Sequence, residues 1–123
     1  MAMADDNASK AELEPREPTL EDLRDLCHEL NRRGARYVVI GGFAVRAAGY
    51  IRRTMDVDLI VAGDAENESK IFGALATLPD NAVRELKPGE LQQYNVIRVA
   101  DEILVDLCVQ RAVSTTPLRR KMR

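Results

Sequence analysis

Two aspartates, Asp56 and Asp58, stand two residues apart at the start of an apolar segment that runs to Val61. In a β-strand, residues i and i+2 project from the same face about 6.5 to 7 Å apart, so both carboxylates would point to one side. A third carboxylate, Asp106, is an isolated charge inside the apolar run 103–108. If these two strands are neighbours, about 4.8 Å apart, the three carboxylates would share one small site.

Such a site favours phosphoryl-transfer chemistry with magnesium. Three anions about 5 Å apart repel one another by on the order of 3 kcal/mol per pair at an effective dielectric constant of 20, so a counter-ion is needed. Mg²⁺ binds a few carboxylates together with water and phosphate oxygens, and two such ions can bridge the attacking and leaving oxygens of a displacement. We therefore predict that Asp56, Asp58 and Asp106 are catalytic and bind Mg²⁺, as one ion or two. The structural alternatives are a polar strand edge or a turn cap for the first two, and a buried, hydrogen-bonded carboxylate for Asp106.

Four further residues are candidates for binding a nucleotide. Gly41 and Gly42 lie where a predicted strand feeds a helix, and backbone amides without a Cβ nearby can approach a triphosphate closely. A plain tight turn explains two glycines equally well, and the sequence contains no GxxxxGK[ST] motif. Thr54 shares the strand-face parity of Asp56, and Arg52 could meet phosphate oxygens from the preceding loop. The alternative for Arg52 is a solvent-exposed loop arginine.

Hydrophobic periodicity supplies the elements that would position these residues. Helices are predicted over 19–33, 43–48 and 65–78, and strands over 37–40, 55–61, 83–86, 94–99 and 103–109, with a loop at 88–89. The β-branched run 37–40 is typical of a strand covered on both faces. The short connection 100–102 requires an antiparallel hairpin, whereas the earlier strand–helix–strand segments favour parallel pairing. The predicted fold class is α/β (α+β), with a mixed β-sheet flanked by helices.

The 123 residues are enough for one domain. We predict a disordered N-terminal tail over 1–17, the folded domain over 18–113 and a basic C-terminal tail over 114–123, which is solvated unless it contacts nucleic acid. The net charge of −2 carries no signature of nucleic-acid binding, so any such contact would be local. The sequence shows no membrane span or apolar leader, which predicts a cytoplasmic protein. Cys27 and Cys108 are expected to be reduced and buried, and His28 to lie on a helix surface or half-buried.

The segment 39–61 also resembles a known family. Its glycine pair, followed by Gly-Tyr-x-Arg-x-Thr-x-Asp-x-Asp over 49–58, resembles the nucleotidyltransferase superfamily that includes DNA polymerase beta. It is most similar to the small bacterial nucleotidyltransferases of abortive-infection and toxin–antitoxin systems, and the likeness spans roughly 37–108. The resemblance implies that Asp56 and Asp58 bind the metals and that Asp106 completes the triad and helps to activate the acceptor hydroxyl. It also implies that Gly41 and Gly42 hold the nucleotide phosphates.

The implied reaction is transfer of a nucleoside monophosphate from a nucleoside triphosphate to a hydroxyl, with release of pyrophosphate. The acceptor stays open between a protein, an RNA and a small molecule. Two departures from the family pattern matter: many members have Gly-Ser in place of Gly41-Gly42, and active members usually add a helical domain or a partner protein. The alternatives are therefore a catalytically inactive binding or regulatory module acting with a partner protein, and a homodimer that builds the acceptor side from a second copy.

Overall fold

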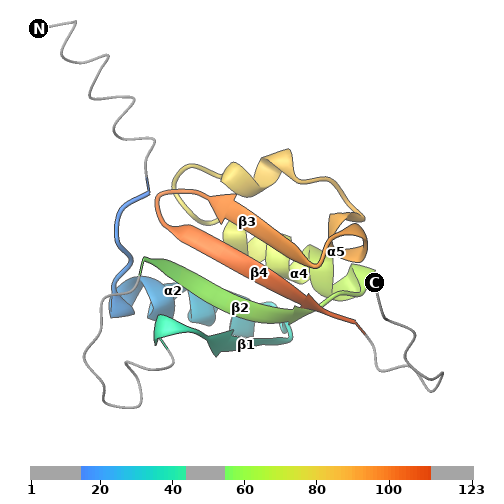
Figure 1. Ribbon diagram of the computed structural model, residues 1–123, viewed down its shortest axis with the longest axis horizontal. Coiled ribbons are helices and arrows are strands. Elements are labelled where there is room, and N and C mark those ends of the chain that lie inside the picture. The colour runs from blue at the N-terminus through green and yellow to red at the C-terminus, as the bar shows by residue number, and fades with distance from the viewer. Residues whose placement is uncertain (1–14, 44–54, 112–123) are drawn as a thin grey trace, which may run out of the picture.

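The computed structural model of the chain describes residues 15–43 and 55–111, and it confirms a mixed sheet flanked by helices. The four strands lie side by side in the order β1-β2-β4-β3 (Figure 1). Along the chain the elements are α2 (Leu20–Arg32), β1 (Tyr37–Ile40), β2 (Asp56–Ala62), α4 (Ala65–Leu75), the 3₁₀ helix η1 (Ala82–Glu85), α5 (Glu90–Gln93), β3 (Val96–Ala100) and β4 (Leu104–Gln110).

Strand pairing places β2 and β4 at the centre of the sheet. They run parallel and in register, while β3 and β4 form the predicted antiparallel hairpin. The parallel pairing predicted for the first two strands is wrong, because β1 and β2 are antiparallel, with Ile40 opposite Asp58. The chain thus re-enters the sheet at the end of β1 that it left. The parallel connection comes one step later, where α4 and β3 carry the chain from β2 to β4.

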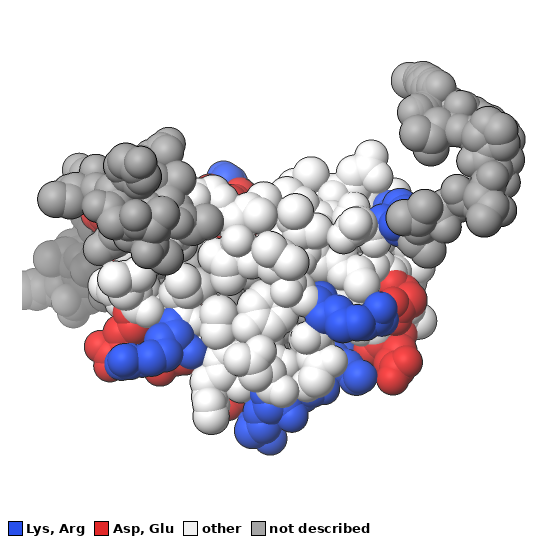
Figure 2. All heavy atoms as spheres, turned by 90° about the horizontal axis from the view of Figure 1, so that it is seen from below, with Lys and Arg blue, Asp and Glu red and all other residues white. Residues whose placement is uncertain are grey.

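Only one face of the sheet is covered by the described helices. Side chains alternate strictly along β2, where Val57, Leu59 and Val61 are fully buried beneath α2 and α4 (Figure 1). The prediction that the strand 37–40 is covered on both faces is wrong, since Val38 is 58% exposed on this edge strand. Seen from below, the surface has a broad uncharged centre with charged side chains gathered along its lower margin (Figure 2). Because the odd-numbered residues of β2 are buried, its even-numbered residues lie on the face opposite the core.

The first helix begins as its sequence predicts. The Thr19 side chain accepts from the Asp22 amide and the Asp22 carboxylate accepts from the Thr19 amide, which forms a capping box. Arg16 donates to Asp22 and to Glu102, and it holds the pKa of the Asp22 carboxyl down at about 2. Arg16, within the segment predicted as the N-terminal tail, is thus bonded to both α2 and the β3–β4 turn.

Buried carboxylates organise the segments between α4 and β3. The strand predicted over 83–86 is wrong, because these residues form η1 and the turn after it. Asp101, 1% exposed, accepts from the amides of Asp80 and Ala82, so these amides need no partner strand. Glu68 does the same for Gly89 and for Leu91 in α5, a short helix that directly follows the loop predicted at 88–89.

The remaining side-chain predictions concern thiols and histidine. Cys27 and Cys108 are free thiols, as predicted, but both are half-buried rather than fully buried. Burial raises the pKa of the Cys108 thiol on β4. His28 lies exposed on the surface of α2, which is one of the two positions expected for it. Among the helices of the described residues, none has the length and apolarity needed to cross a membrane.

Candidate metal centre

The three predicted aspartates come together on the face of the sheet that the described helices leave uncovered. Asp56 and Asp58 project from β2, and Asp106 projects from β4 directly opposite Asp58 in the parallel ladder. Each offers a carboxylate oxygen, and these oxygens lie within 4.8 Å of one another. The arrangement follows from two facts of strand geometry, the two-residue period of β2 and the in-register pairing of β2 with β4. We call these three side chains the carboxylate cluster.

Partial burial and the repulsion from its neighbours perturb the middle carboxylate of the cluster, Asp58. The pKa of Asp58 is raised to about 6, first because burial disfavours its charged form and then because Asp56 and Asp106 are nearby anions. Burial and the two neighbouring carboxylates both favour the protonated form of Asp58 and so raise its pKa. A divalent cation would relieve the part of this effect that comes from the neighbouring carboxylates.

A basic side chain that sequence reasoning missed also reaches the cluster. Arg98 on β3 pairs with Asp106 across the hairpin, and its Nε and Nη2 atoms donate to the two Asp106 carboxylate oxygens at 2.7 and 2.8 Å. Its Nη2 atom also lies 3.3 Å from an oxygen of Asp56. This guanidinium holds the pKa of Asp106 below its usual range. Arg98 is a single charge within the apolar strand predicted over 94–99. This isolated charge is the feature of the sequence that could have identified Arg98 as part of the site.

Gly41 brings the backbone into direct contact with the cluster. It follows β1 with a φ of +78°, and a Cβ added to it would lie 2.4 Å from a carboxylate oxygen of Asp58. The glycine is therefore required both by the left-handed backbone and by the space that Asp58 takes. Gly42, next in the chain, is helical, so the turn does feed a helix as predicted. Arg52, Thr54 and most of the predicted helix 43–48 lie outside the described residues.

The donor set of the cluster fits a hard divalent cation. Three carboxylates from two strands can each supply one oxygen, and oxygen is the ligand that Mg²⁺ and Ca²⁺ prefer. The side chains of Asp106 and Asp56 are 14% and 26% exposed, so an ion and its water ligands can reach them from solvent. Residues Asp56, Asp58 and Asp106 would thus hold a metal ion, with Gly41 leaving room for the Asp58 carboxylate.

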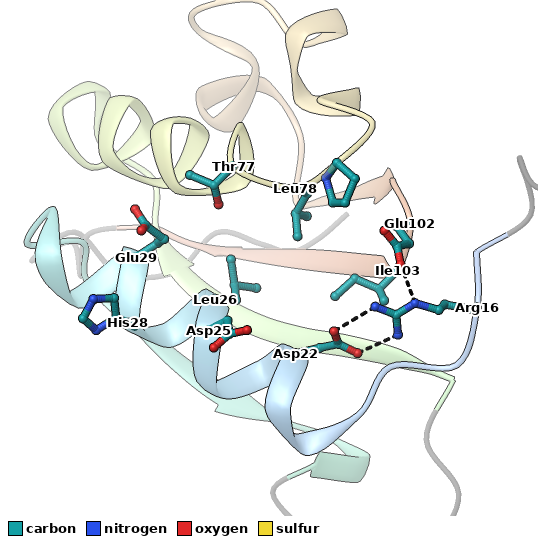
Figure 3. A pocket seen from close by; sticks show the side chains of 11 residues that line it. Arg16, Asp22, Asp25, Leu26, His28, Glu29, Thr77, Leu78, Glu102 and Ile103 are labelled. Carbon is teal, nitrogen blue, oxygen red and sulfur yellow. Dashed lines mark hydrogen bonds and ion pairs between the residues drawn. The ribbon is translucent and has the colours of Figure 1, made fainter.

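A separate cavity of about 410 Å³ lies on the helix side of the sheet (Figure 3). Its lining includes the acidic side chains of Asp25, Glu29 and Glu102 and the exposed His28. Arg16 is drawn between Asp22 and Glu102 in this cavity, where it makes both ion pairs (Figure 3). The surroundings are unfavourable for an anionic nucleotide, and the carboxylate cluster is on the opposite face of the sheet.

We expect the stability of the metal-free protein to depend on pH through the ionisation of Asp58. Because the pKa of the folded state, about 6, lies above the ordinary value of 3.8, this group makes the protein less stable as pH rises from about 4 to above 6. The free energy of unfolding of Asp58→Asn should therefore exceed that of wild type by on the order of 1 kcal/mol at pH 8, after allowance for solvent screening. This gain in stability should vanish near pH 4. Urea unfolding with a chelator present measures this difference, and an equal gain at both pH values would contradict the assignment.

Comparisons of this chain with protein-family models, with curated proteins and with solved structures found no match.

Proposed function

We propose that the protein is a magnesium-dependent nucleotidyltransferase. It would transfer a nucleoside monophosphate from a nucleoside triphosphate to a hydroxyl group. The observation that carries the proposal is the convergence of Asp56, Asp58 and Asp106 from two parallel strands, beside the backbone of Gly41. The Gly41 backbone also lies so close to Asp58 that an added Cβ would meet its carboxylate.

The residues of the site have separable tasks in this reaction. A bound Mg²⁺ supplies charge neutralisation for the triphosphate and polarises the reacting oxygens. Asp56, Asp58 and Asp106 would hold the ion, and Asp106 would also help to activate the acceptor hydroxyl for attack on the α-phosphorus. The new bond joins the acceptor oxygen to the α-phosphorus, the bond between this phosphorus and the bridging oxygen breaks, and pyrophosphate leaves with that oxygen. The hydroxyl proton passes to solvent. The backbone amides of the turn at Gly41 and Gly42 would bind the phosphates.

A transfer assay tests the proposal. We expect pyrophosphate release that depends on Mg²⁺ and stops with a chelator when the chain is incubated with nucleoside triphosphates labelled at the α-phosphate. Candidate acceptors are the chain itself, added RNA and small polyols or aminoglycosides, and label found on one of them identifies the acceptor class. Absence of label and of pyrophosphate release with every triphosphate and acceptor class, also at high protein concentration, would contradict the proposal.

A second candidate is a non-catalytic module that uses this fold to bind a partner protein. The bidentate pair of Arg98 with Asp106 favours it, because this ion pair neutralises part of the cluster without any metal. Co-purification of a stable complex that lacks nucleotide turnover would support it. A third candidate is a homodimeric enzyme in which the second copy supplies the acceptor-binding side of the active site. Light scattering distinguishes this homodimer from a monomer.

A further inference from the structure

Arg98 stands where it can control the metal affinity of the carboxylate cluster. Within the described part of the chain, Arg98 reaches the cluster through ion pairs to both oxygens of Asp106 and to one oxygen of Asp56. Three carboxylates and one guanidinium leave a net charge of −2 when all are ionised. One divalent cation balances that charge, whereas two would exceed it.

We propose that Arg98 is a positioning residue that competes with the metal ion for Asp106, so that tight metal binding requires the triphosphate. This inference rests on the proposed function. A cation bound to Asp106 must share a carboxylate oxygen with an N–H group of Arg98, because both oxygens already accept one. The cation must also approach the positive charge of the Arg98 guanidinium, which repels it. The guanidinium cannot lose its proton at physiological pH, so the repulsion persists throughout that range.

The triphosphate removes this obstacle. It adds several negative charges beside the cluster, which offset both the metal ions and the guanidinium. The Arg98 side chain is 56% exposed, so it is free to turn toward a phosphate oxygen while its strand stays in place. Arginine is well suited to such a partner, because its planar N–H groups match phosphate as well as carboxylate. The consequence is coupling: metal and nucleotide each bind weakly alone and strengthen one another.

The test is a titration with Mn²⁺, followed by water proton relaxation, on the full chain at low salt. We expect Arg98→Met, which keeps much of the side-chain length without the charge, to bind Mn²⁺ alone about tenfold more tightly than wild type. Arg98→Lys keeps the charge and should stay near wild type. Arg84→Met is the matched control, since Arg84 is an exposed arginine that donates to a backbone carbonyl, and it should change nothing. Thermal unfolding of each variant confirms that it is folded.

A second titration uses a triphosphate with a non-hydrolysable α,β linkage. Wild type should gain more Mn²⁺ affinity from this ligand than Arg98→Met does, and higher salt should narrow the difference between the two proteins. If Arg98→Met binds Mn²⁺ no more tightly than wild type, or if Arg98→Lys behaves like Arg98→Met, the competition is refuted and the proposed function stands. If Mn²⁺ binding is the same in wild type and in Asp58→Asn, the proposed function fails and this inference fails with it.

Discussion

Replacement of Asp58 by asparagine is expected to abolish nucleotidyl transfer while leaving the protein folded. Asp58 follows Asp56 on the same face of β2 and lies directly opposite Asp106 on β4. Its loss therefore removes the central ligand of the cluster. A catalytic metal contributes several kcal/mol of transition-state stabilisation, and 1.36 kcal/mol corresponds to a tenfold change in rate. We therefore expect a loss of roughly a thousandfold or more in kcat/KM. The rate of pyrophosphate release at saturating Mg²⁺ measures it.

The matched control is Asp25→Asn. Asp25 is an exposed aspartate on α2, on the opposite side of the sheet, and its replacement removes the same charge from the protein as a whole. It should retain the wild-type rate. Because Asp58→Asn relieves repulsion, unfolding experiments without metal should find this variant at least as stable as wild type. Unchanged turnover in a folded Asp58→Asn protein would show that the carboxylate cluster takes no part in the reaction.

Substitution of alanine at Gly41 is expected to damage the site far more than the fold. The new Cβ would lie 2.4 Å from a carboxylate oxygen of Asp58 and 3.2 Å from its Cγ, so the carboxylate must swing away from the cluster. We expect Mn²⁺ affinity to fall by at least tenfold, because a displaced ligand no longer completes the set. The unfolding free energy should fall by about 1 to 2 kcal/mol from the left-handed backbone alone.

Gly34→Ala separates these two effects. Gly34 also has a positive φ, +74°, but the nearest atom to its added Cβ is the Lys70 Nζ at 3.7 Å. The two alanine variants should share the backbone penalty in urea unfolding, while only Gly41→Ala loses Mn²⁺ binding. Equal metal affinity in the two variants would show that Gly41 is a turn residue with no part in the site.

The residues of the carboxylate cluster could be named from local rules, although their meeting depends on the long-range pairing of β2 with β4. The two-residue period of a strand places Asp56 and Asp58 on one face wherever that strand lies in the sheet. Asp106 could be assigned as a candidate because an isolated charge in an apolar run needs a partner or a ligand. The helix that begins after Thr19 was equally readable, since its capping box involves residues three apart. Each of these predictions needs only short-range information.

The missed features depend on long-range pairing. The predicted connection 100–102 centres the hairpin on Asp101 and sets Arg98 opposite Leu104, whereas the observed turn centres on Glu102 and sets Arg98 opposite Asp106. A one-residue change at the turn thus decides whether an arginine joins the cluster. Likewise, η1 forms where a strand was predicted because amides after α4 bond to the distant Asp101. The direction of β1 was similarly decided by its partner, β2.

The most direct test of the central claim, that three aspartates from two strands form one metal site, is a crystal structure of the protein soaked with Mn²⁺. The claim predicts an anomalous peak bound by one oxygen each from Asp56, Asp58 and Asp106, at metal–oxygen distances of about 2.1 to 2.2 Å. An absence of anomalous density at the cluster at high Mn²⁺ concentration, with Arg98 still bound to both oxygens of Asp106, would contradict it.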